Sequence, residues 1–72
     1  MDGGEEAMTD AETIAKFWKM RHISSTEEVM CSVLGGEWFA AIHTWTHVWA
    51  GDGRTQASAM RAAIRQYDRD ND

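Results

Sequence analysis

The chain has 72 residues, enough for one small domain, and twelve acidic against seven basic residues give it a formal net charge of −5. A domain of this size buries only about 60% of its unfolded surface, so its core must be small. The single cysteine excludes an internal disulfide, and no apolar run reaches the roughly 18 residues of a membrane span. The acidic excess disfavours nucleic acid as a partner and favours a protein with a basic surface.

The first predicted element is a helix over about residues 10–22. Thr9 and Glu12 have the spacing of a capping box, which marks a helix start. The predicted core face follows the helical repeat and consists of Ala11, Ile14, Ala15 and Trp18. Residues 1–8 are acidic and contain two glycines, so we expect a flexible tail there.

Three strands are predicted to follow. Alternating side chains indicate a strand over 29–34, and Gly35-Gly36 is typical of a hairpin that leads into a strand over 37–42. A third strand is predicted near 46–50, after a short link at Thr44-Trp45, and 51–53 are predicted as a turn. We expect one sheet face to be free of helices and to carry some of the tryptophans.

A second helix is predicted from an N-cap at Thr55 to residue 69, with 70–72 frayed. Its predicted core face consists of Gln56, Met60, Ala63, Ile64 and Tyr67. The sequence therefore predicts a single α+β domain over 9–69. Its order is α-β-β-β-α, with a three-stranded antiparallel sheet and two helices on one face.

This order and the segment GDGRTQASAMRAAI resemble the double-stranded RNA-binding domain. In that family, glycines and a serine precede a last helix whose lysines grip RNA phosphates. Gly51, Gly53 and Thr55 match the glycines and the serine, and Ala59 and Ala63 match two alanines. The three lysine positions are Gln56, Ala57 and Met60. The resemblance implies an alternative function, nucleic-acid binding through Arg54, Arg61 and Arg65.

The chain is also similar to small phage proteins of the "phage ABA sandwich" kind. The matching residues are Trp38, Phe39, Gly53, Thr55, Ala59, Arg61, Ala62 and Ala63. This resemblance implies a phage origin and a place in the bacterial cytoplasm, with which the lack of a signal-peptide pattern agrees. By analogy it implies an inhibitor of a host defence complex, such as an anti-CRISPR protein that binds a CRISPR effector or another defence nuclease.

Residues with catalytic or metal-binding chemistry are few. His43 and His47 have a spacing that would suit zinc on a helix, but they fall in a β region. Cys31, a histidine and Asp52 could form a triad only if the fold brought them together. We expect no metal, no cofactor and no enzymatic activity.

The predicted function is therefore protein binding. Acidic side chains would enter a basic nucleic-acid channel and an exposed indole would anchor the contact. The predicted partner-binding residues are Glu27, Glu28, Glu37, Trp45 and Asp52. A homodimer joined through the open sheet face or a strand edge is a further alternative.

Overall fold

The computed structural model describes residues 8–71 and confirms the predicted order of elements. These elements are α1 (Asp10–Lys19), the 3-10 helix η2 (Met20–His22), β1 (Thr26–Leu34), β2 (Glu37–Thr44), β3 (Val48–Gly53) and α2 (Gln56–Asn71). Of the predicted tail only Met8 is described, and the rest of it, like residue 72, lies outside the described residues.

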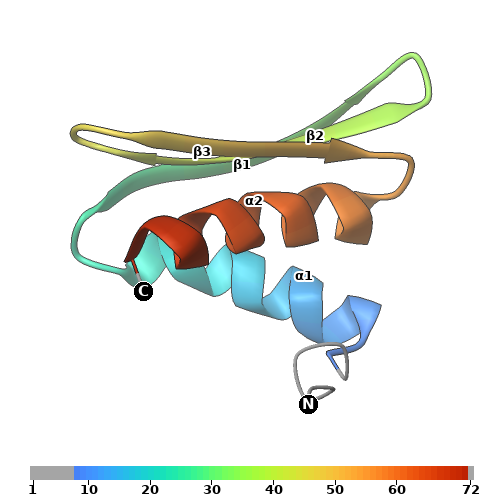
Figure 1. The fold of residues 1–72 in the computed structure, drawn as a ribbon. Coiled ribbons are helices and arrows are strands. Elements are labelled where there is room, and N and C mark those ends of the chain that lie inside the picture. Colours follow the sequence, from blue (N-terminus) through green and yellow to red (C-terminus); the bar gives the residue numbers. More distant parts are fainter. Residues whose placement is uncertain (1–7, 72) are drawn as a thin grey trace.

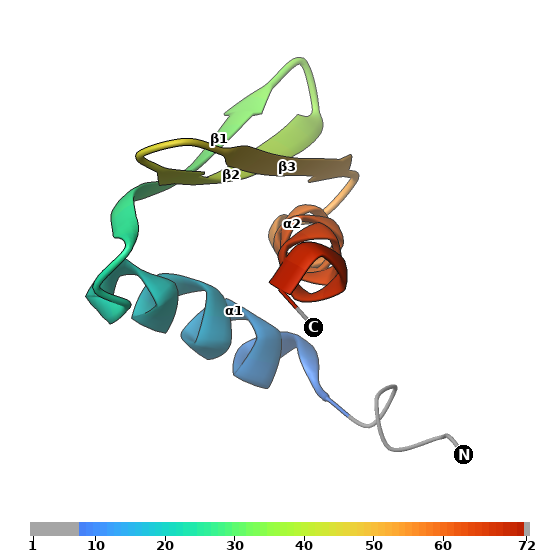
Figure 2. The same cartoon turned by 60° about the vertical axis from the view of Figure 1, so that its left-hand side comes forward.

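The strands form one antiparallel sheet in the order β1-β2-β3, and both helices lie on the same side of it (Figures 1 and 2). α2 packs directly beneath β3 and β2, whereas α1 packs mainly against α2. The opposite face of the sheet carries no helix in either view. The predicted α+β architecture is thus confirmed.

The hairpin between β1 and β2 turns at Gly35 and Gly36, as predicted. Both glycines have positive φ, +60° and +81°, which a two-residue type I′ turn requires at both positions. From this turn the β1–β2 ladder runs without interruption to Glu28, which pairs with His43. An extra residue, Glu27, then shifts the register, and this bulge ends the regular part of β1.

β3 lies further along the chain than predicted, since Gly51 and Gly53 belong to the strand rather than to a turn. Both glycines face α2, and both lack the room for a β-carbon. A Cβ on Gly51 would lie 2.5 Å from the Ala63 backbone nitrogen and 2.6 Å from the Ala59 carbonyl oxygen, and one on Gly53 would overlap Ser58. The glycines therefore allow the strand to approach α2 closely. A sequence pattern cannot distinguish glycines with this role from glycines in a turn.

The core lies between the sheet and α2. Its buried apolar residues are Phe17, Met20, Ala40, Ile42, Trp49, Ala57, Ala59, Met60, Ala63 and Ile64. The predicted core face of α2 is confirmed for Met60, Ala63 and Ile64, with Tyr67 packed at its edge.

The core face of α1 is as predicted for Ile14 and Trp18, which pack against the core, but it differs at other positions. Thr13, Phe17 and Met20 are buried, whereas Ala11 and Ala15 are exposed. Thr13 is accommodated in the core because its hydroxyl donates a hydrogen bond to the Thr9 carbonyl oxygen at 2.9 Å. The predicted capping box at the start of α1 is present.

Both ends of α2 are held by side chains. At the start, the Thr55 hydroxyl accepts a hydrogen bond from the Ser58 backbone at 3.1 Å, as expected for an N-cap. At the other end the helix continues through Asn71, so the predicted fraying is wrong for residues 70 and 71. The reason is tertiary, because Asp70 accepts a hydrogen bond from the Trp49 indole at 2.7 Å.

The two helices are joined by polar contacts. Arg61 on α2 donates hydrogen bonds to the Asp10 carboxylate and to the Thr13 hydroxyl, both at 3.0 Å. Lys16 and Asp68 form a second, more exposed pair at 3.7 Å. These contacts hold α1 against α2. Both helices therefore lie on one side of the sheet, and the far face of the sheet is a separate surface.

Candidate interaction surface

The far side of the sheet, which we call the open face, is built from alternate residues of all three strands. Their side chains point away from the helices because neighbouring strand residues face opposite sides. The apolar members are Met30, Leu34, Phe39, Ala41, Val48 and Ala50. Met30, Phe39 and Val48 are 45%, 42% and 57% exposed, although they are large and apolar. An apolar strip therefore crosses this face without a cover from the described residues.

Acidic side chains lie at both ends of the open face. Glu28 is at the end where β1 begins, and Glu37 and Asp52 are at the hairpin end. Asp52 raises the pKa of Glu37, first through a hydrogen bond that favours the protonated carboxyl and second through charge repulsion. The Glu37–Asp52 pair therefore places concentrated negative charge beside the apolar strip.

The predicted partner-binding residues do not form one patch. Glu28 pairs with His43, six residues along β2 from Glu37, so the two acidic ends are about 20 Å apart. Glu27, in the bulge, belongs to the Glu28 end. Trp45 also lies near that end, because the β2–β3 turn follows Thr44 and Thr44 pairs with Thr26.

The expectation that the open face carries tryptophans is wrong for the strands. Trp38 and Trp49 both point toward the helices, since they pair with Gly53 and Ile42 on that side. The open face instead presents Phe39 and aliphatic side chains. Sequence alternation fixes which residues share a face, but it does not say which face the helices will cover.

Trp45 is the exception, and it is 80% exposed at the tip of the β2–β3 turn. The turn beneath it is ordered by hydrogen bonds, in which the Thr44 hydroxyl accepts from the His47 backbone at 3.1 Å and the Thr46 hydroxyl contacts His47 Nδ1 at 2.8 Å. A stable turn thus presents a free indole ring, which is an effective contact group because it is large and rigid.

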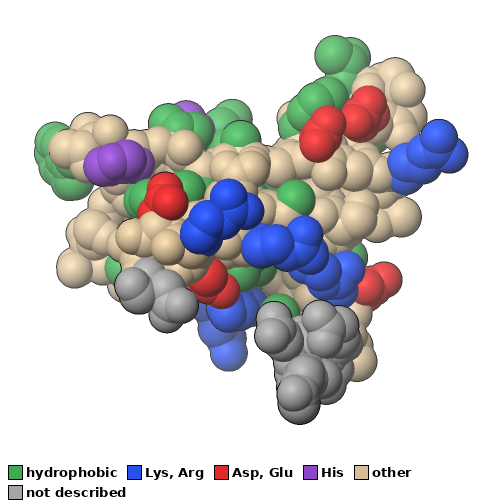
Figure 3. All heavy atoms as spheres, viewed as in Figure 1, with side chains coloured by type: hydrophobic (Ala, Val, Ile, Leu, Met, Phe, Trp, Pro, Cys, Tyr) green, Lys and Arg blue, Asp and Glu red, His purple; other side chains and the backbone are tan. Residues whose placement is uncertain are grey.

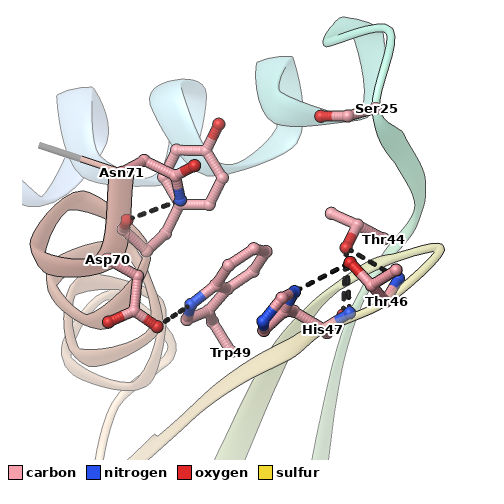
Figure 4. Close-up of a pocket in the computed structure, with 8 residues that line it drawn as sticks. Ser25, Thr44, Thr46, His47, Trp49, Asp70 and Asn71 are labelled. Carbon is pink, nitrogen blue, oxygen red and sulfur yellow. Dashed lines mark hydrogen bonds between the residues drawn. The ribbon is translucent and has the colours of Figure 1, made fainter.

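A hollow of about 350 Å³ lies on the helix side of this turn (Figure 4). It is lined by Ser25, Thr44, Thr46, His47, Trp49, Tyr67, Asp70 and Asn71. Trp49 forms one wall, with its ring stacked on His47 at 5.5 Å and edge-on to Tyr67 at 4.9 Å. The same residues that line the hollow therefore fasten the end of α2 to the sheet.

The residues that line the hollow do not form a linked catalytic triad. The Thr46 hydroxyl touches His47, but Asp70, the carboxylate in the hollow, is bonded to the Trp49 indole instead of orienting the imidazole. The other triad considered, Cys31 with Asp52, is divided by the sheet, because Cys31 faces the helices and Asp52 faces away. Burial also raises the pKa of the Cys31 thiol, which disfavours the reactive thiolate.

Within residues 8–71, no three His, Cys, Asp or Glu side chains come close enough together to hold a metal ion. His43 lies on the open face, whereas His47 belongs to the turn and the hollow. In the same part of the chain, neither helix has the length and apolar character needed to cross a lipid bilayer.

Basic side chains are spread over the helical layer, away from the open face (Figure 3). Arg54 lies in the link between β3 and α2, and Arg65 is exposed on α2. Arg61, the third residue of the nucleic-acid alternative, is held by Asp10 and Thr13.

No family model, no curated protein and no solved structure matches this chain. The two resemblances drawn from the sequence, to the double-stranded RNA-binding domain and to small phage proteins, therefore stay predictions.

Proposed function

We propose that this protein is a non-catalytic binding module whose open face docks on another protein. The observation that carries the proposal is the apolar strip around Phe39, Met30 and Val48, which has an acidic group at each end. Exposed apolar patches with a polar rim are typical of protein interfaces. The chain's net charge of −5 and its acidic rim favour a partner with basic groups around an apolar centre.

Two contact elements follow from the geometry. Phe39 lies in the middle strand and would be covered by any protein seated on the face. Trp45 projects from one end and would reach a second site on the same partner. The Glu37–Asp52 pair at the other end would meet a basic group, which would also relieve the repulsion between the two carboxylates.

We propose, as the specific form of this activity, the occlusion of a basic nucleic-acid channel in a host defence complex. Its support is the acidic rim and the resemblance to phage proteins. The nucleic-acid alternative has less support, because Arg61 already binds Asp10 and Thr13. Arg54 and Arg65 would be left to supply the phosphate contacts.

The test is a capture experiment from bacterial lysate with tagged wild-type protein and three variants. Phe39→Ser removes the centre of the strip and Trp45→Ala removes the anchor. Arg65→Gln is the matched control in the helical layer. We expect one protein to be recovered by the wild type and by Arg65→Gln, to be lost with Phe39→Ser, and to be reduced with Trp45→Ala.

Equal recovery with Phe39→Ser, or no recovery with the wild type, would contradict the binding proposal. If the captured protein binds nucleic acid, adding the wild-type chain should displace its duplex. Direct binding of the chain to duplex RNA that weakens steeply with salt, and is lost with Arg54→Gln, would favour the alternative instead.

A further inference from the structure

The free edge of β1 is a second unused surface, which adjoins the open face and shares Met30 and Leu34 with it. β1 pairs with β2 on one side, and no strand among residues 8–71 pairs with its other side. Its backbone N–H and C=O groups on that side are a template for another strand. Edge strands are often protected by Pro, charged side chains or a bulge, but in β1 these features are confined to Glu27, Glu28 and the bulge at its start, and residues 29–34 contain no charge and no Pro.

Several exposed side chains along this edge are large and apolar. Val33 and Leu34 are 51% and 76% exposed, and Met30 is also exposed. Of the seven large hydrophobic residues that are exposed in the described chain, these three lie on β1. An uncharged edge with exposed apolar side chains, as over residues 29–34, is unfavourable for a chain that stays alone, and it is well suited to pairing with a strand of similar length.

The regular part of β1 is self-complementary in an antiparallel arrangement. It runs from Glu28, after the bulge, to Leu34, and its midpoint is Cys31. A two-fold axis through Cys31 and perpendicular to the sheet would keep each residue on its own face. It would place Val29 opposite Val33, and Cys31 opposite its own copy, on the helix side.

The same axis separates the acidic charges. Glu28 would lie opposite Leu34 of the second copy, and the two copies of Glu28 would be about 20 Å apart. Directly opposed like charges destabilise a strand pair, and this register avoids them. Met30 would lie opposite Ser32, so no charged residue faces another charged residue along the ladder.

We propose that two copies of this chain pair through their β1 edges into one continuous six-stranded antiparallel sheet. All four helices lie on one side of that sheet, and the two open faces join on the other. The pairing satisfies the free backbone groups of both edges and covers Val33, which helps a domain whose own core is small. The pairing depends on the backbone edge of β1 and on Val33 on the helix side, whereas the proposed function depends on Phe39 and Trp45, so either proposal can fail without the other.

The first test is the mass of the purified chain in solution, by sedimentation across about a hundredfold dilution series. We expect the mass to rise from one chain, 8.1 kDa, toward two as the concentration rises. Val33→Lys places a charge on the paired edge, and it should weaken the dimer by at least about tenfold. Val48→Lys is the matched control, similarly exposed but on β3, and should leave the dimer unchanged. Circular dichroism checks that both variants fold.

The second test uses Cys31 to identify the register, with copper-phenanthroline and air as the oxidant. Residues directly opposite in an antiparallel pair have Cα atoms about 4.5–5.5 Å apart, which suits a disulfide. We expect rapid formation of a disulfide-linked dimer in the wild type. The control is Val48→Cys in a Cys31→Ser background. Its thiol is more exposed, but the two copies would lie about 30 Å apart, because five strand spacings separate them across the sheet and about 20 Å separates them along the strands, so it should react slowly.

Three results would overturn the proposal: a single-chain mass at every concentration, a dimer insensitive to Val33→Lys, or faster crosslinking of the Val48→Cys control than of the wild type. The last would indicate that open faces stack on each other. The chain could instead be monomeric by itself and bind an extended segment of another protein along β1. That result would contradict self-pairing and would make the other protein the partner of this edge.

Discussion

The two faces of the sheet share their strands and differ in almost everything else. Toward the helices, β2 and β3 contribute Ile42, Trp49 and two glycines that allow α2 to approach. Toward solvent, the same strands present Phe39, Val48 and acidic residues. Alternate residues of each strand therefore contribute to folding stability on one face and to the proposed interaction on the other. Substitutions at adjacent positions can measure the two contributions separately.

The largest difference in stability loss is expected between substitutions at Gly51 and at Ala50, which are neighbours on β3. Gly51→Val would push a side chain into the backbone of α2, which cannot yield as a flexible side chain could, and should cost more than about 3 kcal/mol. A domain of this size has a stability of only about 4–10 kcal/mol, so far-UV circular dichroism should show an unfolded or barely folded chain. Ala50→Val, on the open face, should remain within about 0.5 kcal/mol of the wild type. Similar losses from both substitutions would refute the close packing of β3 on α2.

The next contrast compares Ile42 with Phe39 on β2. Ile42 is fully buried, so Ile42→Ala should lower the free energy of unfolding by about 2–5 kcal/mol. Phe39→Ala removes a larger side chain from the exposed face and should cost less than about 1 kcal/mol. Urea denaturation of both variants measures the difference. A greater loss from Phe39→Ala would mean that the open face is covered in the isolated protein.

Trp49 and Trp45 provide a smaller contrast between two indoles. Trp49→Phe keeps an aromatic ring in the core but removes the N–H that donates a hydrogen bond to Asp70. It should lower the free energy of unfolding by about 1 kcal/mol. Trp45→Phe, at the exposed turn, should leave the melting temperature unchanged. Hydrogen exchange in the last turn of α2 should rise only in Trp49→Phe, and an unchanged rate there would show that Asp70 does not hold the helix end.

The smallest effect should come from Glu37, and it depends on pH. Because Asp52 raises the pKa of Glu37 in the folded state, the folded chain binds more protons than the unfolded chain between the ordinary and the raised value. Stability contributed by Glu37 is therefore present at lower pH and lost as the pH rises through the raised pKa. Glu37→Gln should melt slightly above the wild type at neutral pH and match it at pH values below the ordinary range of a glutamate. Glu28→Gln is the control at the other end of the face, and the same pH-dependent gain there would exclude the Asp52 contact as the cause.

Much of the fold could be predicted from local patterns. The capping box at Thr9, the glycine pair at the first hairpin and the N-cap at Thr55 each depend on nearby residues, and each is present. The end of β3 could not be predicted, because Gly51 is read locally as a turn residue and its role comes from α2. The extension of α2 past residue 69 likewise depends on Trp49, which is distant in the sequence.

The candidate surface was predictable only in part. The exposed Trp45 follows from its place in a short turn, and strand alternation groups Glu37, Phe39 and His43 on one face. Alternation alone cannot say that this face, rather than the one with Trp38, is left open. The free edge of β1 depends on the order of strands in the sheet, which the sequence does not state.

The glycines of β3 have a consequence for how the sequence of this protein can vary. The absent β-carbons set the spacing between strand and helix, so position 51 tolerates almost no replacement and position 53 tolerates few, whereas the adjacent positions 50 and 52 lie on the other side of the sheet. A saturation library of this strand, selected for folding alone, should therefore show tolerance that rises and falls with a period of two. In natural variants of this protein, substitutions in the strand should likewise be frequent and rare at alternate positions.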